Sequence, residues 1–148
     1  MGKIDLPIAK RYRVGRAATG LGLFATAAIG TGAFIVEYKG PRITHAQAAR
    51  REARGHRYMF EINGRWTVDG SSRRNIARYA NHSCRPNAET DLVKGKVILR
   101  AIKRINPGDE ITYDYGEEYF ELFLKPSGCK CGKCQAKRRK RNRTASTG

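Results

Sequence analysis

Short runs of β-branched and aromatic residues, each bounded by a turn signal, constrain the fold of this chain most. Six such runs are LGLFAT, AFIVEY, YMFEI, WTVD, KVILRAI and EITYDY. The turns IGTG, NG, KGK and NPGD separate or precede them, and Asn-Gly is the strongest short signal for a β-hairpin. These runs have the length of strands rather than helices. The sequence therefore predicts many short strands, with hairpins across NG and KGK.

One segment has a helical pattern instead. Thr44 and Gln47 fit a capping box, in which a threonine caps a helix and a glutamine three residues on caps the threonine. The run AQAARREAR continues this helix until Gly55 ends it, and shorter helical turns are expected over NIARYA and EEYFELFL. One main helix among many strands predicts an α+β, β-rich fold. A length of 148 residues suits one domain with a tail.

The chain carries a formal net charge of +17 at pH 7. Residues 137–143 (KRRKRNR) hold six of the 30 Lys and Arg residues, so most of the positive charge lies elsewhere. Such a field attracts nucleic acid without regard to its sequence. This charge predicts that the protein binds a polyanionic partner or acts close to one. A basic surface kept for solubility, and a nuclear localisation signal in KRRKR, remain alternatives.

Residues 17–36 carry no charge and follow the basic stretch KRYRVGR, as a signal peptide or membrane span would. Four glycines and three threonines make this stretch a poor helix. We therefore expect two short strands around glycine turns, an intracellular protein and no membrane partner. The motif GLGLFA at residues 20–25 also has the form of a dinucleotide-binding glycine motif. The strand before it and the helix within it, which that fold requires, are not indicated.

The four cysteines are one alone, Cys84, and three together in GCKCGKC, namely Cys129, Cys131 and Cys134. Three thiols so close in sequence cannot easily pair with one another. A C-x-C-x2-C cluster is typical of metal sites, and a fourth ligand would complete one tetrahedral zinc site. From spacing alone, that fourth ligand could equally be His82 or Cys84.

The order of the motifs resembles that of the SET-domain protein lysine methyltransferases, including their zinc-binding post-SET segment. GLGLFA precedes IVEYKG, YMFEI, WTVDG, NIARYANHSCRPNA, GDEITYDYG and the cysteine cluster, and the resemblance covers residues 13–135. It implies a SET fold of small β-sheets with a knot-like core, in which RYANHS crosses the chain near Tyr115. It also implies a SET domain at 13–116, a post-SET zinc-binding segment at 117–135 and a basic disordered tail at 136–148.

The resemblance implies S-adenosylmethionine as the methyl donor and one zinc ion. The matching cofactor-binding positions are Gly20, Leu21, Gly22, Tyr58, Arg78, Asn81 and His82. In the family the main chain of the Asn-His pair holds the adenine, and the sequence places no carboxylate that would orient His82 as a general base. The implied zinc ligands are Cys84, Cys129, Cys131 and Cys134, although the usual family spacing is C-x-C-x4-C.

Three tyrosines match catalytic positions of the family. Tyr115, the last residue of YDY, matches the tyrosine that orients the methyl donor and the substrate amine, and Tyr38 matches a wall of the lysine channel. An apolar, aromatic channel favours the neutral amine by desolvation, and the aromatic faces stabilise positive charge. Tyr113 stands where the family carries phenylalanine or tyrosine. Its hydroxyl leaves less room for methyl groups, so we expect mainly mono-methylation with some di-methylation.

The resulting hypothesis is an S-adenosylmethionine-dependent protein lysine N-methyltransferase that acts on histones or histone-like basic proteins. A first alternative is a catalytically silent SET module that binds nucleic acid or chromatin through its basic surface. A second is a zinc-stabilised nucleic-acid-binding protein without a cofactor. The expected location is the cytoplasm or nucleoid in a prokaryote and the nucleus in a eukaryote, with export to a host left open.

Overall fold

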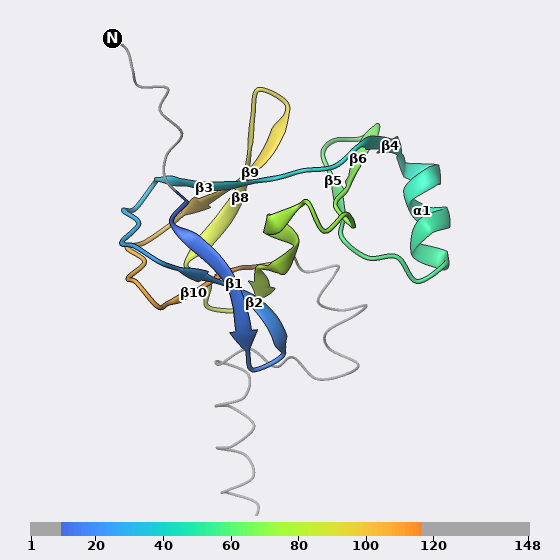
Figure 1. Cartoon of the computed structure of the whole chain (residues 1–148). Coiled ribbons are helices and arrows are strands. Elements are labelled where there is room, and N and C mark those ends of the chain that lie inside the picture. The colour runs from blue at the N-terminus through green and yellow to red at the C-terminus, as the bar shows by residue number, and fades with distance from the viewer. Residues whose placement is uncertain (1–9, 117–148) are drawn as a thin grey trace, which may run out of the picture.

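The structure is a computed structural model that describes residues 10–116. Within this range it contains ten strands, one α-helix and one 3-10 helix (Figure 1). The strands form two sheets. The larger sheet has the order β1-β2-β10-β8-β9-β3, with β7 beside β10, and the smaller sheet has the order β4-β6-β5. The predicted β-rich α+β architecture is confirmed.

The larger sheet is built mainly from the strand-like runs of the sequence. Its strands are β1 (Tyr12–Ala17), β2 (Gly20–Ala25), β3 (Phe34–Tyr38), β7 (Asn81–His82), β8 (Ala88–Val93), β9 (Lys96–Ala101) and β10 (Glu110–Tyr113). β8 and β9 form the hairpin expected across KGK. Lys94 and Gly95 at its turn have φ angles of 51° and 78°, which suit a tight two-residue hairpin loop. Strand β1 was not expected, because arginines interrupt its apolar pattern.

The smaller sheet carries the helix. Its strands are β4 (Arg42–Thr44), β5 (Met59–Glu61) and β6 (Trp66–Asp69), and β5 and β6 pair antiparallel as expected. Helix α1 (His45–Ala53) follows β4. Its predicted capping box is present, since the Gln47 amide donates to Thr44 Oγ1 over 3.2 Å and the Thr44 amide donates to Gln47 Oε1 over 2.9 Å. These bonds satisfy amide groups that the helix itself cannot pair.

The hydrophobic core lies on the larger sheet. Leu23, Ile29, Leu99, Ile105 and Ile111 are all fully buried there. The 3-10 helix η1 (Ile76–Tyr79), expected from NIARYA, contacts β2 and β3. Within residues 10–116, no helix is long and apolar enough to cross a membrane.

Two segments far apart in sequence run side by side where the site lies. Strand β7 pairs in parallel with β10, so that Asn81 lies opposite Thr112 and His82 opposite Tyr113. The Ser83 amide also donates to the Tyr113 carbonyl over 3.2 Å. The RYANHS segment therefore lies against the chain that leads to Tyr115, as the resemblance implied.

Several predictions fall outside the described residues. They are the helical turn over EEYFELFL, the segments 117–135 and 136–148, and the three clustered cysteines.

Candidate active site

The glycine motif begins β2 and contacts β7 and β10. Asn81 Nδ2 donates to the Leu21 carbonyl over 3.0 Å and to Glu110 Oε2 over 2.8 Å. A Cβ atom at Gly22 would lie 2.7 Å from Glu110 Oε2 and 2.9 Å from the Cβ of Ala17, so a larger residue there would displace a neighbour. Gly20 differs, because its φ of 121° favours glycine and a Cβ atom there would have nothing within 4 Å. Only Gly20 therefore leaves open space beside the backbone.

Four of the predicted site tyrosines line one narrow pocket, which we call the aromatic pocket. Its volume is about 50 Å³, and its lining residues are Tyr38, Tyr58, Met59, Phe60, Tyr113 and Tyr115. The rings of Tyr113 and Tyr115 lie 4.8 Å apart between centroids, and those of Tyr38 and Phe60 lie 5.6 Å apart. A pocket of this size and lining suits the end of one extended apolar or cationic side chain.

Two hydroxyl protons of the aromatic pocket are directed to backbone carbonyls. Tyr115 Oη donates to the Ala80 carbonyl over 2.6 Å, and Tyr38 Oη donates to the Tyr58 carbonyl over 2.6 Å. A phenolic hydroxyl has one proton. Toward a ligand, each of these oxygens can therefore act only as a hydrogen-bond acceptor, which suits an amine or another donor.

A second, wider pocket is also lined by Tyr58, and we call it the arginine pocket. Its volume is about 460 Å³, and its lining residues are Arg54, Gly55, His56, Arg57, Tyr58, Ser71 and Arg78. Arg78 Cζ lies 4.4 Å from the centroid of the Tyr58 ring, and its guanidinium also donates to the Ser71 carbonyl. Among residues 10–116, this lining includes three arginines and no acidic residue, so it suits an anionic group.

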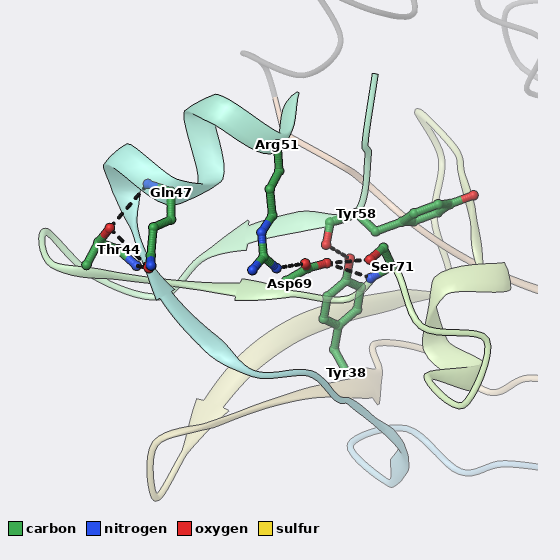
Figure 2. A network of polar contacts seen from close by, with 7 residues as sticks. All are labelled: Tyr38, Thr44, Gln47, Arg51, Tyr58, Asp69 and Ser71. Carbon is green, nitrogen blue, oxygen red and sulfur yellow. Dashed lines mark hydrogen bonds and ion pairs between the residues drawn. The ribbon is translucent and has the colours of Figure 1, made fainter. Parts of the chain in front are cut away.

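A polar network joins helix α1 to the turn that follows β6 (Figure 2). Asp69, at the end of β6, accepts hydrogen bonds from the Ser71 amide over 3.0 Å and from Ser71 Oγ over 2.6 Å. It also pairs with the Arg51 guanidinium. Burial alone would raise the pKa of the Asp69 carboxyl, but the bonds from Ser71 and Arg51 outweigh it and hold this pKa below its ordinary value.

His82 joins the catalytic candidate Tyr115 to Cys84. Its Nδ1 accepts a hydrogen bond from the Tyr115 amide over 3.1 Å, so the ring proton lies on Nε2, which is 3.3 Å from Cys84 Sγ. Burial lowers the pKa of His82, and the nearby Asp114 carboxylate partly opposes this. Asp114 Oδ1 lies 3.7 Å from Nδ1, a neighbour that the sequence did not indicate. With Nδ1 occupied by an amide, the ring is placed to orient the chain rather than to take a proton.

Only one of the four expected zinc ligands lies among the residues that the structure describes. Cys84 lies in the described range, and Cys129, Cys131 and Cys134 lie outside it. Among residues 10–116, no three His, Cys, Asp or Glu side chains gather as a metal site would require. The zinc assignment therefore stays a prediction.

Several of the predicted residues that the structure describes lie close together, and further residues line the same pockets. Tyr38, Tyr58, Tyr113 and Tyr115 share the aromatic pocket, and Arg78 stacks on Tyr58. Sequence reasoning missed the pocket residues Phe60 and Arg54, and also the buried Asp69. The only sequence signal for Asp69 was its position in an Asp-Gly pair at the end of a predicted strand, which marks a turn.

Comparison with known proteins identifies the family. The histone-lysine N-methyltransferase Set2 of Drosophila melanogaster is 37% identical in an alignment of 122 positions that covers 76% of this chain and 5% of that protein. Trithorax of Drosophila virilis, also named a histone-lysine N-methyltransferase, is 34% identical in an alignment of 152 positions that covers 88% of this chain and 4% of that protein.

A solved structure has the same fold. A chain of the Chaetomium thermophilum Polycomb Repressive Complex 2 bound to GSK126 has a TM-score of 0.68 and 32% identity, covering 74% of this chain and 16% of that one. This chain thus spans a small part of the length of each of these relatives. Residues 20–116 match the SET domain. The chain belongs to the SET domain family.

Proposed function

We propose that this chain is an S-adenosylmethionine-dependent protein lysine N-methyltransferase that acts on histones or histone-like basic proteins. The observation that carries the proposal is the aromatic pocket, in which four tyrosines from three separate segments line a volume of about 50 Å³. The relatives Set2 and trithorax, which are named histone-lysine N-methyltransferases, support the same activity. The narrow pocket suits the amine end of a lysine side chain.

In this proposal the aromatic pocket prepares the amine. A lysine has a pKa of about 10.4 in water, and only its neutral form is a nucleophile. Removal from water disfavours the ammonium ion and so promotes loss of its proton to solvent. The oxygens of Tyr115 and Tyr38 accept hydrogen bonds and can hold the remaining N–H groups, which directs the nitrogen lone pair. Alignment of this kind accounts for much of the rate acceleration.

The methyl donor would bind in the arginine pocket. S-adenosylmethionine supplies a methyl group on a positively charged sulfur. The guanidinium of Arg78 in the arginine pocket suits the carboxylate of that molecule. The open backbone at Gly20 and the main chain of Asn81 and His82 would hold the adenosine part. These assignments rest on the resemblance, and on the contact of Asn81 with the Leu21 carbonyl.

We further propose that Tyr113 limits the number of methyl groups. Tyr113 is buried, and its ring packs against that of Tyr115 in the aromatic pocket. Its hydroxyl takes space that a di- or trimethylated amine would need. Mono-methylation is therefore the expected main product, with some di-methylation.

The zinc proposal rests on Cys84 and on the C-x-C-x2-C spacing of Cys129, Cys131 and Cys134. Zinc would be bound by four thiolates and would order the segment that carries three of them. Metal analysis of the purified chain should give one zinc per chain, and Cys84→Ser should lower this value. A wild-type chain purified without zinc that still binds the cofactor would contradict the proposal.

The basic surface supports a further part of the proposal, contact with nucleic acid beside the protein substrate. The net charge of +17 attracts polyanions by a long-range field. Binding to a DNA duplex should therefore weaken steeply as salt rises. Affinity that does not change with salt would refute this assignment.

The test of the main proposal is intact-mass analysis of substrates after incubation with the chain and S-adenosylmethionine. Core histones and a bacterial DNA-packaging protein serve as substrates, and Tyr115→Phe is compared with the wild type. Tyr79→Phe is the matched control, because Tyr79 lies on η1 and does not line the aromatic pocket. Mass increases of one methyl group that Tyr115→Phe abolishes and Tyr79→Phe retains would support the enzyme.

Two other outcomes are informative. If the chain binds the cofactor but methylates none of these proteins, the proposed enzyme acts on a different protein substrate. Neither binding nor methylation would refute the enzyme. It would then favour the silent SET module that binds nucleic acid or chromatin through its charge.

A further inference from the structure

Tyr58 is the wall shared by the two pockets, and its backbone is strained. It lines both the aromatic pocket and the arginine pocket. Its φ is 72°, a left-handed conformation that costs a bulky residue free energy and persists only when its surroundings impose it. Something in the surrounding structure must therefore hold Tyr58 in this position.

The turn at residues 69–71 holds Tyr58 from two sides. At the backbone, the Gly70 amide donates to the Tyr58 carbonyl over 2.8 Å, beside the bond from Tyr38 Oη. At the ring, the Ser71 carbonyl accepts from the Arg78 guanidinium, which lies over the Tyr58 face. Both supports of Tyr58 thus depend on the geometry of the same short turn.

Asp69 determines the geometry of that turn. Its side chain is 7% exposed and accepts two hydrogen bonds from Ser71, one from the amide and one from the hydroxyl. The Arg51 guanidinium on α1 pairs with the same carboxylate (Figure 2). Charge-assisted bonds of this kind are stronger than neutral ones and restrict geometry more. The carboxylate therefore links the helix to the turn and the turn to Tyr58.

We propose that Asp69 is a positioning residue that holds Tyr58 in place between the two pockets through the turn at residues 69–71. The inference rests on the proposed function, since it assigns the two pockets to the substrate amine and the methyl donor. Asp69 lines neither pocket. Its effect on binding and on product must therefore pass through residues that do line them, namely Ser71, Tyr58 and Arg78.

Asp69→Asn tests this role, because asparagine has nearly the same shape and lacks the charge. Asp91→Asn is the matched control, since Asp91 also pairs with an arginine, Arg100, at 3.2 Å, but on the exposed face of β8. Ser71→Ala removes a single hydrogen bond and serves as a milder second variant if Asp69→Asn does not fold. Circular dichroism verifies that each variant is folded.

Three readouts separate positioning from general stability. The first is the Kd of S-adenosylhomocysteine by calorimetry, which should rise about tenfold in Asp69→Asn, and less in Ser71→Ala. The second is the product distribution by mass spectrometry, which should shift toward higher methylation states because Tyr58 is held less firmly. The third is hydrogen exchange at the Gly70 amide, which should become faster. Asp91→Asn should leave all three at their wild-type values.

A folded Asp69→Asn with wild-type Kd, product distribution and Gly70 exchange would overturn the inference. The outcome for the proposed function is read separately. If the wild type neither binds S-adenosylhomocysteine nor methylates, the proposed function fails, and Gly70 exchange alone then decides whether Asp69 holds the turn.

Discussion

Substitution of Gly70 by alanine is expected to displace Tyr38 and so to disturb both the fold and the aromatic pocket. A Cβ atom at Gly70 would lie 2.6 Å from Tyr38 Oη and closer still to two carbons of its ring. The Gly70 backbone has no left-handed φ, so alanine meets no conformational barrier there. The conflict is therefore purely steric, and the buried Tyr38 ring has to move.

The cost can be worked out from three contributions. Overpacking of a dense core costs about 1–3 kcal/mol. Displacement of Tyr38 breaks its 2.6 Å bond to the Tyr58 carbonyl, which costs about 1 kcal/mol. Alanine lowers the conformational entropy of the unfolded chain, which stabilises the folded state by about 0.4–1 kcal/mol. The net loss is about 2 kcal/mol, or about 5–10 °C in Tm for a domain of this size.

A double-mutant cycle measured by thermal or urea unfolding checks the reasoning. Tyr38→Leu removes the ring that alanine would meet, so Gly70→Ala should cost nothing further in that background, and the coupling free energy should be about 2 kcal/mol. Gly64→Ala, in the turn between β5 and β6, is the control, because a Cβ atom there would have nothing within 4 Å. A Gly70→Ala variant as stable as the wild type, or additive effects in the cycle, would refute the steric argument.

Four further outcomes follow from the structure. Leu99→Ala, at a fully buried site, should lower the free energy of unfolding by about 2–5 kcal/mol in urea titration; a loss below about 1 kcal/mol would contradict the assigned core. Thr44→Ala removes the capping box and should cost about 1 kcal/mol, which Thr44→Ser should largely restore. The folded-state pKa of Asp69 is lowered, so its contribution is present above the ordinary pKa of about 3.9 and is lost as pH falls through the folded value. The Tm difference between wild type and Asp69→Asn should thus shrink on acidification from neutral pH, and a constant difference would argue against the ion pair. Tyr113→Phe should raise the methylation state seen by mass spectrometry, and an unchanged product would remove Tyr113 from that role.

Local sequence signals were sufficient for most elements of the fold. The capping box at Thr44 and Gln47 and the hairpin turns are formed by neighbours in the chain, so residues a few positions apart already specify them. Strand β7 was missed for the opposite reason. It consists of only Asn81 and His82, and its strand character comes from pairing with β10, far along the chain.

The motifs also indicated which residues belong to the site, but not what each contact does. GLGLFA suggested two glycines with one role, whereas Gly20 leaves open space and Gly22 is closely packed against Glu110. His82 was expected to lack an orienting carboxylate, yet Asp114 lies close to it, and its Nδ1 accepts the Tyr115 amide. Side-chain surroundings of this kind depend on strands that meet only after folding.

The sequence alone thus determined a β-rich SET domain with one capped helix and a set of site tyrosines. Only the tertiary structure decided that Tyr58 lines two pockets and that Asp69 is bonded to the turn that contacts Tyr58. The physical reason is distance along the chain. Tyr38 and Tyr58 are 20 residues apart, and Tyr115 and Ala80 are 35 apart. Local propensity does not encode contacts of that range, because they depend on the register and packing of the sheets.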